Sequence, residues 1–118
     1  MSDEIIALSE ALERVQEDRE LLLELFDIFQ EDFVEKRENI NKAVGAKDFG
    51  ALRDIAHSMK GASSNISAKK IYGSLAKLEQ VAIAGNDQEV NPILKNIDIQ
   101  YQELKAQIEK LKKELKKQ

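Results

Sequence analysis

The sequence predicts an all-α protein, an antiparallel four-helix bundle with a short additional helix at its N-terminus. Three observations lead to this prediction. One proline and five glycines in 118 residues are too few for the many turns that a fold with many strands needs. Apolar residues make up 42% of the chain, which is enough to build a core. These residues recur at steps of three and four, the period of an amphipathic helix, and no stretch alternates as a strand does.

The N-terminal half of the chain predicts two helices of unequal length. A short one covers residues 5–15, with Ser9 capping part of it. Asp18 is a plausible N-cap for a long second helix, which no glycine or proline interrupts before Gly45 ends it. The apolar stripe of this long helix consists of Leu22, Leu25, Phe26, Phe29, Phe33, Ile40 and Val44.

Two shorter helices are expected to follow. Asp48 caps a third helix that begins at Phe49, and the polar run 63–67 marks its end. Ser67 is the expected cap of a fourth helix, which stops at Gly85. The buried faces of the two helices consist of Leu52, Ile55, Met59 and Ile66 in the third and of Ile71, Leu75, Leu78 and Ala82 in the fourth.

The fifth helix is expected to begin after Asp87 and to tolerate Pro92 in its first turns. Its apolar residues form an unbroken heptad seam. The seam consists of Val90, Leu94, Ile97, Tyr101, Leu104, Ile108, Leu111 and Leu115. The basic end of this helix, 105–118, has little hydrophobic support, so we expect it either to fray or to pair with another chain. From these helices we expect the whole chain, 1–118, to form one domain, whose bundle spans about 18–110.

Composition excludes several classes of protein. Without cysteine there is no disulfide scaffold, thiolate zinc site, thiol nucleophile or covalent haem attachment. A single histidine excludes multi-histidine metal sites. No apolar run approaches the length of a membrane span, and the acidic start lacks the basic region of a signal peptide. We therefore expect no membrane insertion and a cytoplasmic location.

Charge is distributed unevenly along the chain, whose net charge is −4. Residues 1–35 hold twelve acids and two bases, whereas 102–118 hold six bases and three acids. The acidic N-terminal third argues against nucleic-acid binding. A basic helix end is most often a solvated face. The expectation is a monomer that binds no nucleic acid.

The only histidine, His57, is the residue on which a chemical function would depend. In the third helix it falls roughly 200° away from Ile55, on the face opposite the apolar stripe. Lys60 and Gly61 follow at helical spacing, within reach of the imidazole. Glycine inside a helix costs about 1 kcal/mol relative to alanine, and here it leaves the surface beside the imidazole open to a macromolecule. A solvated lysine and a loosened helix end are the alternative interpretations of these two residues.

This combination suits a histidine that carries a phosphoryl group. Neutral imidazole is nucleophilic, and phosphoryl transfer requires mainly positioning and charge neutralisation. The chain has no Walker loop, no glycine-rich nucleotide lid and no cluster of carboxylates beside His57 other than Asp54. The sequence therefore predicts no cofactor of its own, and a partner has to supply the metal and the acidic pocket.

Residues 56–66, Ala-His-Ser-Met-Lys-Gly-Ala-Ser-Ser-Asn-Ile, resemble the signature of histidine-containing phosphotransfer (HPt) domains. In that signature an apolar residue, lysine, glycine and a small residue follow the histidine in this order. The resemblance extends from residue 5 to about 110, and it includes the acidic leucine-rich helix before the motif and the pair Leu78–Glu79 after it.

The resemblance implies a phosphorelay intermediate. His57 would accept a phosphoryl group from a receiver-domain aspartate and pass it to another receiver. Lys60 would stabilise the phosphoryl charge, and Gly61 would make room for the receiver. The implied partners are response-regulator receiver domains, a hybrid sensor histidine kinase or both, with Mg²⁺ bound in the receiver.

Four further residues each have two interpretations. Glu79 matches a position where some members of the family hold the imidazole, although an ordinary surface glutamate is an equal alternative. Ser64 and Asn65 either line the docking surface or simply end the helix. Arg53, one turn before His57, either contacts an acidic partner or is a solvated charge.

Other functions fit the sequence less well or stay open. Ser58 and Ala62 occupy places where the dimerisation domain of sensor kinases has glutamate and proline, so that class is rejected. One outward histidine does not suffice for a di-iron bundle, and an exposed helix offers no oxyanion hole for a hydrolase triad. A phosphoacceptor domain excised from a chemotaxis-type or hybrid kinase remains an alternative. A second is a non-catalytic helical adaptor, which the heptad seam favours.

Overall fold

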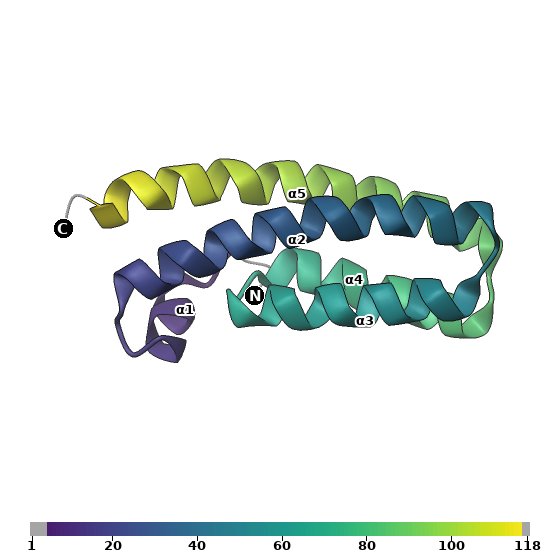
Figure 1. Cartoon of the computed structure of the whole chain (residues 1–118), viewed down its shortest axis with the longest axis horizontal. Coiled ribbons are helices and arrows are strands. Elements are labelled where there is room, and N and C mark those ends of the chain that lie inside the picture. The colour runs from purple at the N-terminus through teal and green to yellow at the C-terminus, as the bar shows by residue number, and fades with distance from the viewer. Residues whose placement is uncertain (1–4, 117–118) are drawn as a thin grey trace.

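The computed structural model describes residues 5–116, and over that range the chain is helical with no strand. These residues form one short helix and four longer ones (Figure 1). Their bounds are Leu8–Arg14 for α1, Arg19–Gly45 for α2, Phe49–Asn65 for α3, Lys69–Ala84 for α4 and Asp87–Lys116 for α5. The expected all-α fold with its short N-terminal helix is confirmed.

The four long helices form an antiparallel bundle in which α3 packs between α2 and α4, and α4 packs against α5. The two long helices, α2 and α5, extend beyond α3 and α4 at one end of the bundle (Figure 1). Helix α1 lies in the space that this difference in length leaves below α2. The Ala7 amide donates to the Ser67 carbonyl at 3.0 Å, which ties the segment before α1 to the turn between α3 and α4.

Local cap chemistry sets the helix boundaries where the sequence predicts it. The carboxylate of Asp18 accepts from the Leu21 amide at 3.1 Å, and that of Asp48 accepts from the Ala51 amide at 3.0 Å. Both predicted N-caps are therefore confirmed. Gly85 ends α4 in the left-handed conformation at φ 66°, which glycine adopts without strain.

Two predicted caps are wrong. Ser9 lies inside α1, because this helix starts at Leu8, later than the predicted residue 5, and its N-cap residue Ala7 provides no side-chain cap. Ser67 does not cap α4 either, because the tight turn after α3 places it at φ 55°, whereas an N-cap residue has an extended backbone. Ala68 takes the N-cap position of α4 without a side-chain hydrogen bond.

All eight residues of the α5 seam are buried, as predicted. The ring of Tyr101 stacks on Phe33 of α2, with the ring centroids 3.9 Å apart. Towards the C-terminus, Leu111 and Leu115 are only 5% and 7% exposed, and Lys112 pairs with Asp27 of α2.

The expectation of a frayed end is therefore wrong up to Lys116, whereas pairing of this end with another chain stays a prediction. The end does not fray because α2 runs alongside α5 to this end and supplies the missing support (Figure 1). Residues 117–118 of that prediction lie outside the described range. No helix among residues 5–116 is long and apolar enough to span a bilayer.

Candidate functional site

His57 projects from the outer face of α3. Its side chain is 70% exposed, whereas Leu52, Ala56 and Met59 of the same helix are buried in the core. Ser63 is also buried, and its hydroxyl donates to the Met59 carbonyl at 2.9 Å. The helix is thus fixed by its inner face, and the imidazole is left accessible to another molecule.

Glu79 of α4 holds the imidazole from one side. Its Oε2 lies 2.9 Å from Nδ1 of His57, and its side chain is only 13% exposed. An ionised carboxylate can only accept a hydrogen bond, so this contact places the imidazole proton on Nδ1. The Nε2 atom then carries the free lone pair and is the nucleophilic nitrogen.

The second carboxylate oxygen of Glu79 pairs with Lys60. The Nζ of Lys60 lies 2.7 Å from Oε1 and 5.9 Å from the ring centroid of Tyr72. The Lys60 ammonium, opposed by partial burial and aided by His57, holds the pKa of the Glu79 carboxyl below its usual value. In return, Glu79 raises the pKa of Lys60.

The ion pair means that Lys60 is not a free cation beside the ring. Its ammonium is already compensated by Glu79, and its side chain is 23% exposed. One carboxylate therefore links the histidine to the lysine, because each of its oxygens contacts one of them. The nearby cation is available to an anion on His57 only if it shares or leaves Glu79.

Gly61 lies one turn after His57 on the exposed surface of α3. A Cβ atom built there meets nothing within 4 Å. Packing inside this chain therefore does not require glycine at this position. The open space is consistent with a requirement imposed from outside, by a molecule that approaches the imidazole.

The remaining predicted residues lie around this centre. Arg53 is half-exposed, and its guanidinium is 3.1 Å from the carboxylate of its neighbour Asp54. Ser64 lines a hollow of about 290 Å³ that Tyr72 also lines, so it lies on the α4 side of α3. Asn65 lines a smaller hollow of about 70 Å³ together with Ile28 of α2. The two residues therefore lie on different flanks of the helix.

Sequence reasoning missed Lys36 of α2. Its Nζ lies 2.5 Å from the hydroxyl of Ser58, the residue that follows His57, and 3.0 Å from the carboxylate of Asp32. The spacing of Asp32 and Lys36 on one helix is a visible signal for their ion pair. The contact with Ser58 depends on how α2 packs against α3, which no local pattern encodes.

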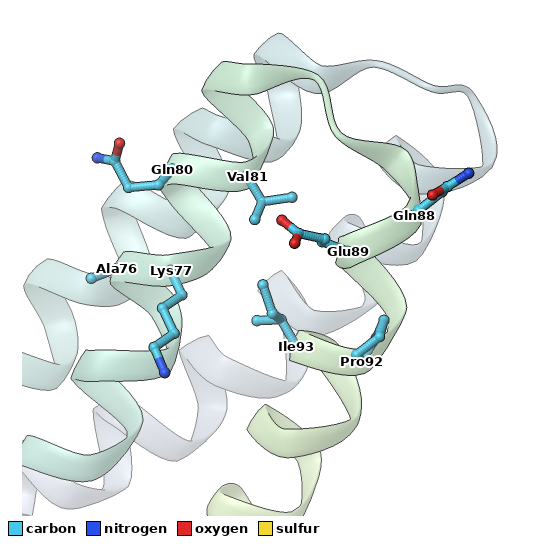
Figure 2. Close-up of a pocket in the computed structure, with 8 residues that line it drawn as sticks. All are labelled: Ala76, Lys77, Gln80, Val81, Gln88, Glu89, Pro92 and Ile93. Carbon is cyan, nitrogen blue, oxygen red and sulfur yellow. The ribbon is translucent and has the colours of Figure 1, made fainter.

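A further hollow lies away from His57. It is a groove of about 620 Å³ between α4 and α5, and Figure 2 shows Val81, Glu89 and Ile93 pointing into it. None of the predicted site residues lines this groove. Over residues 5–116 no three metal-ligating side chains gather in one place.

Comparisons with known proteins point to one family. The family model described as "Hpt domain" matches residues 24–114. The histidine-containing phosphotransfer protein 2 of Arabidopsis thaliana is 27% identical over 103 residues. That match covers 83% of this chain and 66% of the relative, so the chain spans about two thirds of the relative's length.

A solved structure gives the same result. The crystal structure of the histidine-containing phosphotransfer protein B (HptB) of Pseudomonas aeruginosa PAO1 superposes with a TM-score of 0.80 at 27% identity. The match covers 99% of each chain, so the likeness extends over the bundle and the short N-terminal helix alike.

Proposed function

This chain belongs to the histidine-containing phosphotransfer (Hpt) family, and from that membership we propose that His57 is the phosphoryl-carrying residue of a phosphorelay intermediate. His57 accepts a phosphoryl group from the aspartate of one receiver domain and passes it to the aspartate of another. Like its relatives, the chain acts as a relay intermediate together with partner proteins and not as an autonomous enzyme.

The single observation that carries the proposal is the pairing of Glu79 with Nδ1 of an otherwise exposed His57. It leaves the Nε2 lone pair free to attack the phosphorus of an acyl phosphate. The bond between phosphorus and the aspartate oxygen breaks, and the aspartate leaves as a carboxylate. Nδ1 keeps its proton throughout, so the phosphorylated ring carries a positive charge that the Glu79 carboxylate balances.

Lys60 and Gly61 serve the same step in different ways. The Lys60 ammonium pairs with Glu79 on the α4 side of His57, and by sharing or leaving that carboxylate it neutralises part of the charge on the transferred phosphoryl oxygens. Gly61 keeps the approach to the imidazole free of side-chain atoms. Positioning and charge neutralisation are what phosphoryl transfer mainly requires.

The partner supplies what this chain does not provide. We assign the Mg²⁺ ion and the acidic acceptor pocket to the receiver domain, and Arg53, Ser64 and Asn65 to the surface that it contacts. A relay also shares a compartment with its receivers and kinases, which we propose is the cytoplasm.

The test is transfer from a radiolabelled phospho-receiver to the wild type and to His57→Gln. We expect acid-labile, alkali-stable label on the wild type only, because phosphohistidine has that stability pattern. His57→Gln keeps an exposed polar side chain, so its fold is expected to be intact by circular dichroism. Equal labelling of both proteins would place the phosphoryl group on a residue other than His57 and so contradict the assignment. Labelling of neither protein with a panel of receivers would contradict it in favour of a helical adaptor.

A further inference from the structure

Lys36 of α2 is a second cation beside the candidate site, and it lies on the other side of α3 from Lys60. Its ammonium contacts Ser58, the residue directly after His57, at 2.5 Å. Lys60 is directed to α4, because it pairs with Glu79. Since α2 and α4 pack on the two sides of α3, the two lysines flank His57 from both directions.

The surroundings of Lys36 are acidic. Between residues 20 and 35 the chain has six acids and no base, so Lys36 is the first positive charge after Arg19. Its closest counter-charge is Asp32, at 3.0 Å. A receiver that exchanges phosphoryl groups through an aspartate presents carboxylates at its active site. The α2 side of His57 would repel such a partner if Lys36 were absent.

Resting on the proposed function, we propose that Lys36 is a specificity-determining residue for the receiver. It contacts acidic side chains around the partner's aspartate and so governs association and the choice of receiver, not the transfer step. Before docking, the ammonium pairs with Asp32, which competes with the partner for it. On docking, the Lys36 ammonium either leaves Asp32 for a carboxylate of the partner or contacts both carboxylates at once.

A purely structural role for Lys36 is the competing interpretation, since the contact with Ser58 joins α2 to α3. The two roles make opposite predictions for Asp32. If Lys36 only joins the two helices, the loss of Asp32 weakens that contact, lowers the unfolding temperature and raises KM. If Lys36 recruits an acidic partner, the loss of Asp32 removes a competing negative charge and improves association.

The experiment measures phosphoryl transfer from a phosphorylated receiver at increasing receiver concentration, so that KM and kcat are separated. The variants are Lys36→Ala, Lys36→Glu and Asp32→Asn. Lys95→Ala is the matched control, because it removes the same charge from an exposed site on α5, which does not pack beside α3. Thermal unfolding of each variant records any structural effect.

We expect Lys36→Ala to raise KM about three- to fivefold, the usual size of one exposed charge contact. Lys36→Glu is expected to raise it about tenfold, and Asp32→Asn to lower it about twofold. The value of kcat stays that of the wild type. The differences shrink as salt rises from about 0.05 M to about 0.5 M, because the screening length shortens.

Two results would overturn this assignment while leaving the proposed function intact. One is that the Lys36 variants do not raise KM above that of Lys95→Ala, whether or not kcat changes. In this case wild-type labelling at His57 is preserved. The other is a raised KM and a lowered unfolding temperature for Asp32→Asn, which the structural role predicts. Absence of label on wild-type His57 would overturn both proposals together.

Discussion

Glu79 sets both the imidazole tautomer and the position of the Lys60 ammonium at the candidate site, because its carboxylate contacts both of these groups. Oε2 faces Nδ1 of His57 and Oε1 faces Nζ of Lys60. It thereby fixes the imidazole tautomer and keeps the cation nearby. An alanine at this position would remove both contacts, whereas a glutamine would remove the charge and keep an oxygen acceptor.

This difference predicts the behaviour of two variants. Glu79→Gln should keep the proton of the neutral imidazole on Nδ1, because the amide oxygen still accepts a hydrogen bond. Glu79→Ala should give a mixture of tautomers and slow phosphoryl transfer by about tenfold, the cost of one positioning hydrogen bond. Two-dimensional ¹H–¹⁵N spectra of the imidazole and transfer rates check both expectations. Identical spectra for the wild type and Glu79→Ala would contradict the role of Glu79.

The same residue predicts how stability depends on pH. The pKa of Glu79 is lowered in the folded protein, chiefly by Lys60, from an unperturbed value of 4.5. A carboxyl group with a lowered pKa stabilises the fold above its unfolded pKa, and that contribution is lost as the pH falls through the folded pKa. The free energy of unfolding should therefore fall as the pH drops below 4.5.

Glu79→Gln should show a smaller loss over this window, because glutamine does not titrate. It should not abolish the loss, because Lys69 and Ser67 also lower the pKa of Glu10. Urea unfolding at neutral pH and at about pH 3 measures the difference between the two proteins. Equal losses for the wild type and Glu79→Gln would mean that the ion pair with Lys60 contributes nothing to the folded state.

At the scale of the elements, α3 and α4 each contain a glycine with open space around it. At both Gly61 and Gly73, a Cβ atom would meet no atom within 4 Å apart from its chain neighbours and the adjoining helix backbone, so both positions tolerate a side chain. Alanine is a better helix former than glycine. Gly61→Ala and Gly73→Ala should therefore each raise the free energy of unfolding by about 0.5–1 kcal/mol.

The two positions are expected to differ in function. Gly61 lies beside His57 on α3, whereas Gly73 lies on the exposed surface of α4, six residues before Glu79. Gly61→Leu should block phosphoryl transfer by bulk, and Gly73→Leu should transfer at the wild-type rate. Chemical denaturation and transfer assays on both variants form a matched pair. Normal transfer by Gly61→Leu would show that close approach over this residue is not needed.

Elements and site differ in how far they can be predicted from sequence. Asp18, Asp48 and Gly85 act on amides or backbone angles within their own turn, so their roles follow from local chemistry. Ser67 fails as a predicted cap because the turn geometry before α4 overrides its preference. His57, Lys60 and Gly61 share one helix, and their spacing alone brings them together. The contacts of Glu79 and Lys36 are made between different helices. They depend on how those helices align when they pack, which a single sequence does not reveal.

At the scale of the whole molecule, the uneven charge along the chain is balanced in space. The acidic N-terminal part of α2 lies beside the basic C-terminal part of α5 (Figure 1), and Lys112 pairs with Asp27 between them. Arg37 and Asp98 join the same two helices further along, at 2.7 Å. Lys112 of the basic end thus joins α5 to α2.

The C-terminal part of α5 also contributes to the core, and this can be measured directly. Leu111 is 5% exposed and belongs to the core cluster that runs through all five helices. Leu111→Ala should lower the free energy of unfolding by about 2 kcal/mol, near the lower limit for a buried leucine because the bundle end can partly collapse. Lys113→Ala, two residues on and exposed, should change it by less than about 0.5 kcal/mol. Urea unfolding of both variants tests the assignment, and equal stability would mean that α5 frays beyond residue 110.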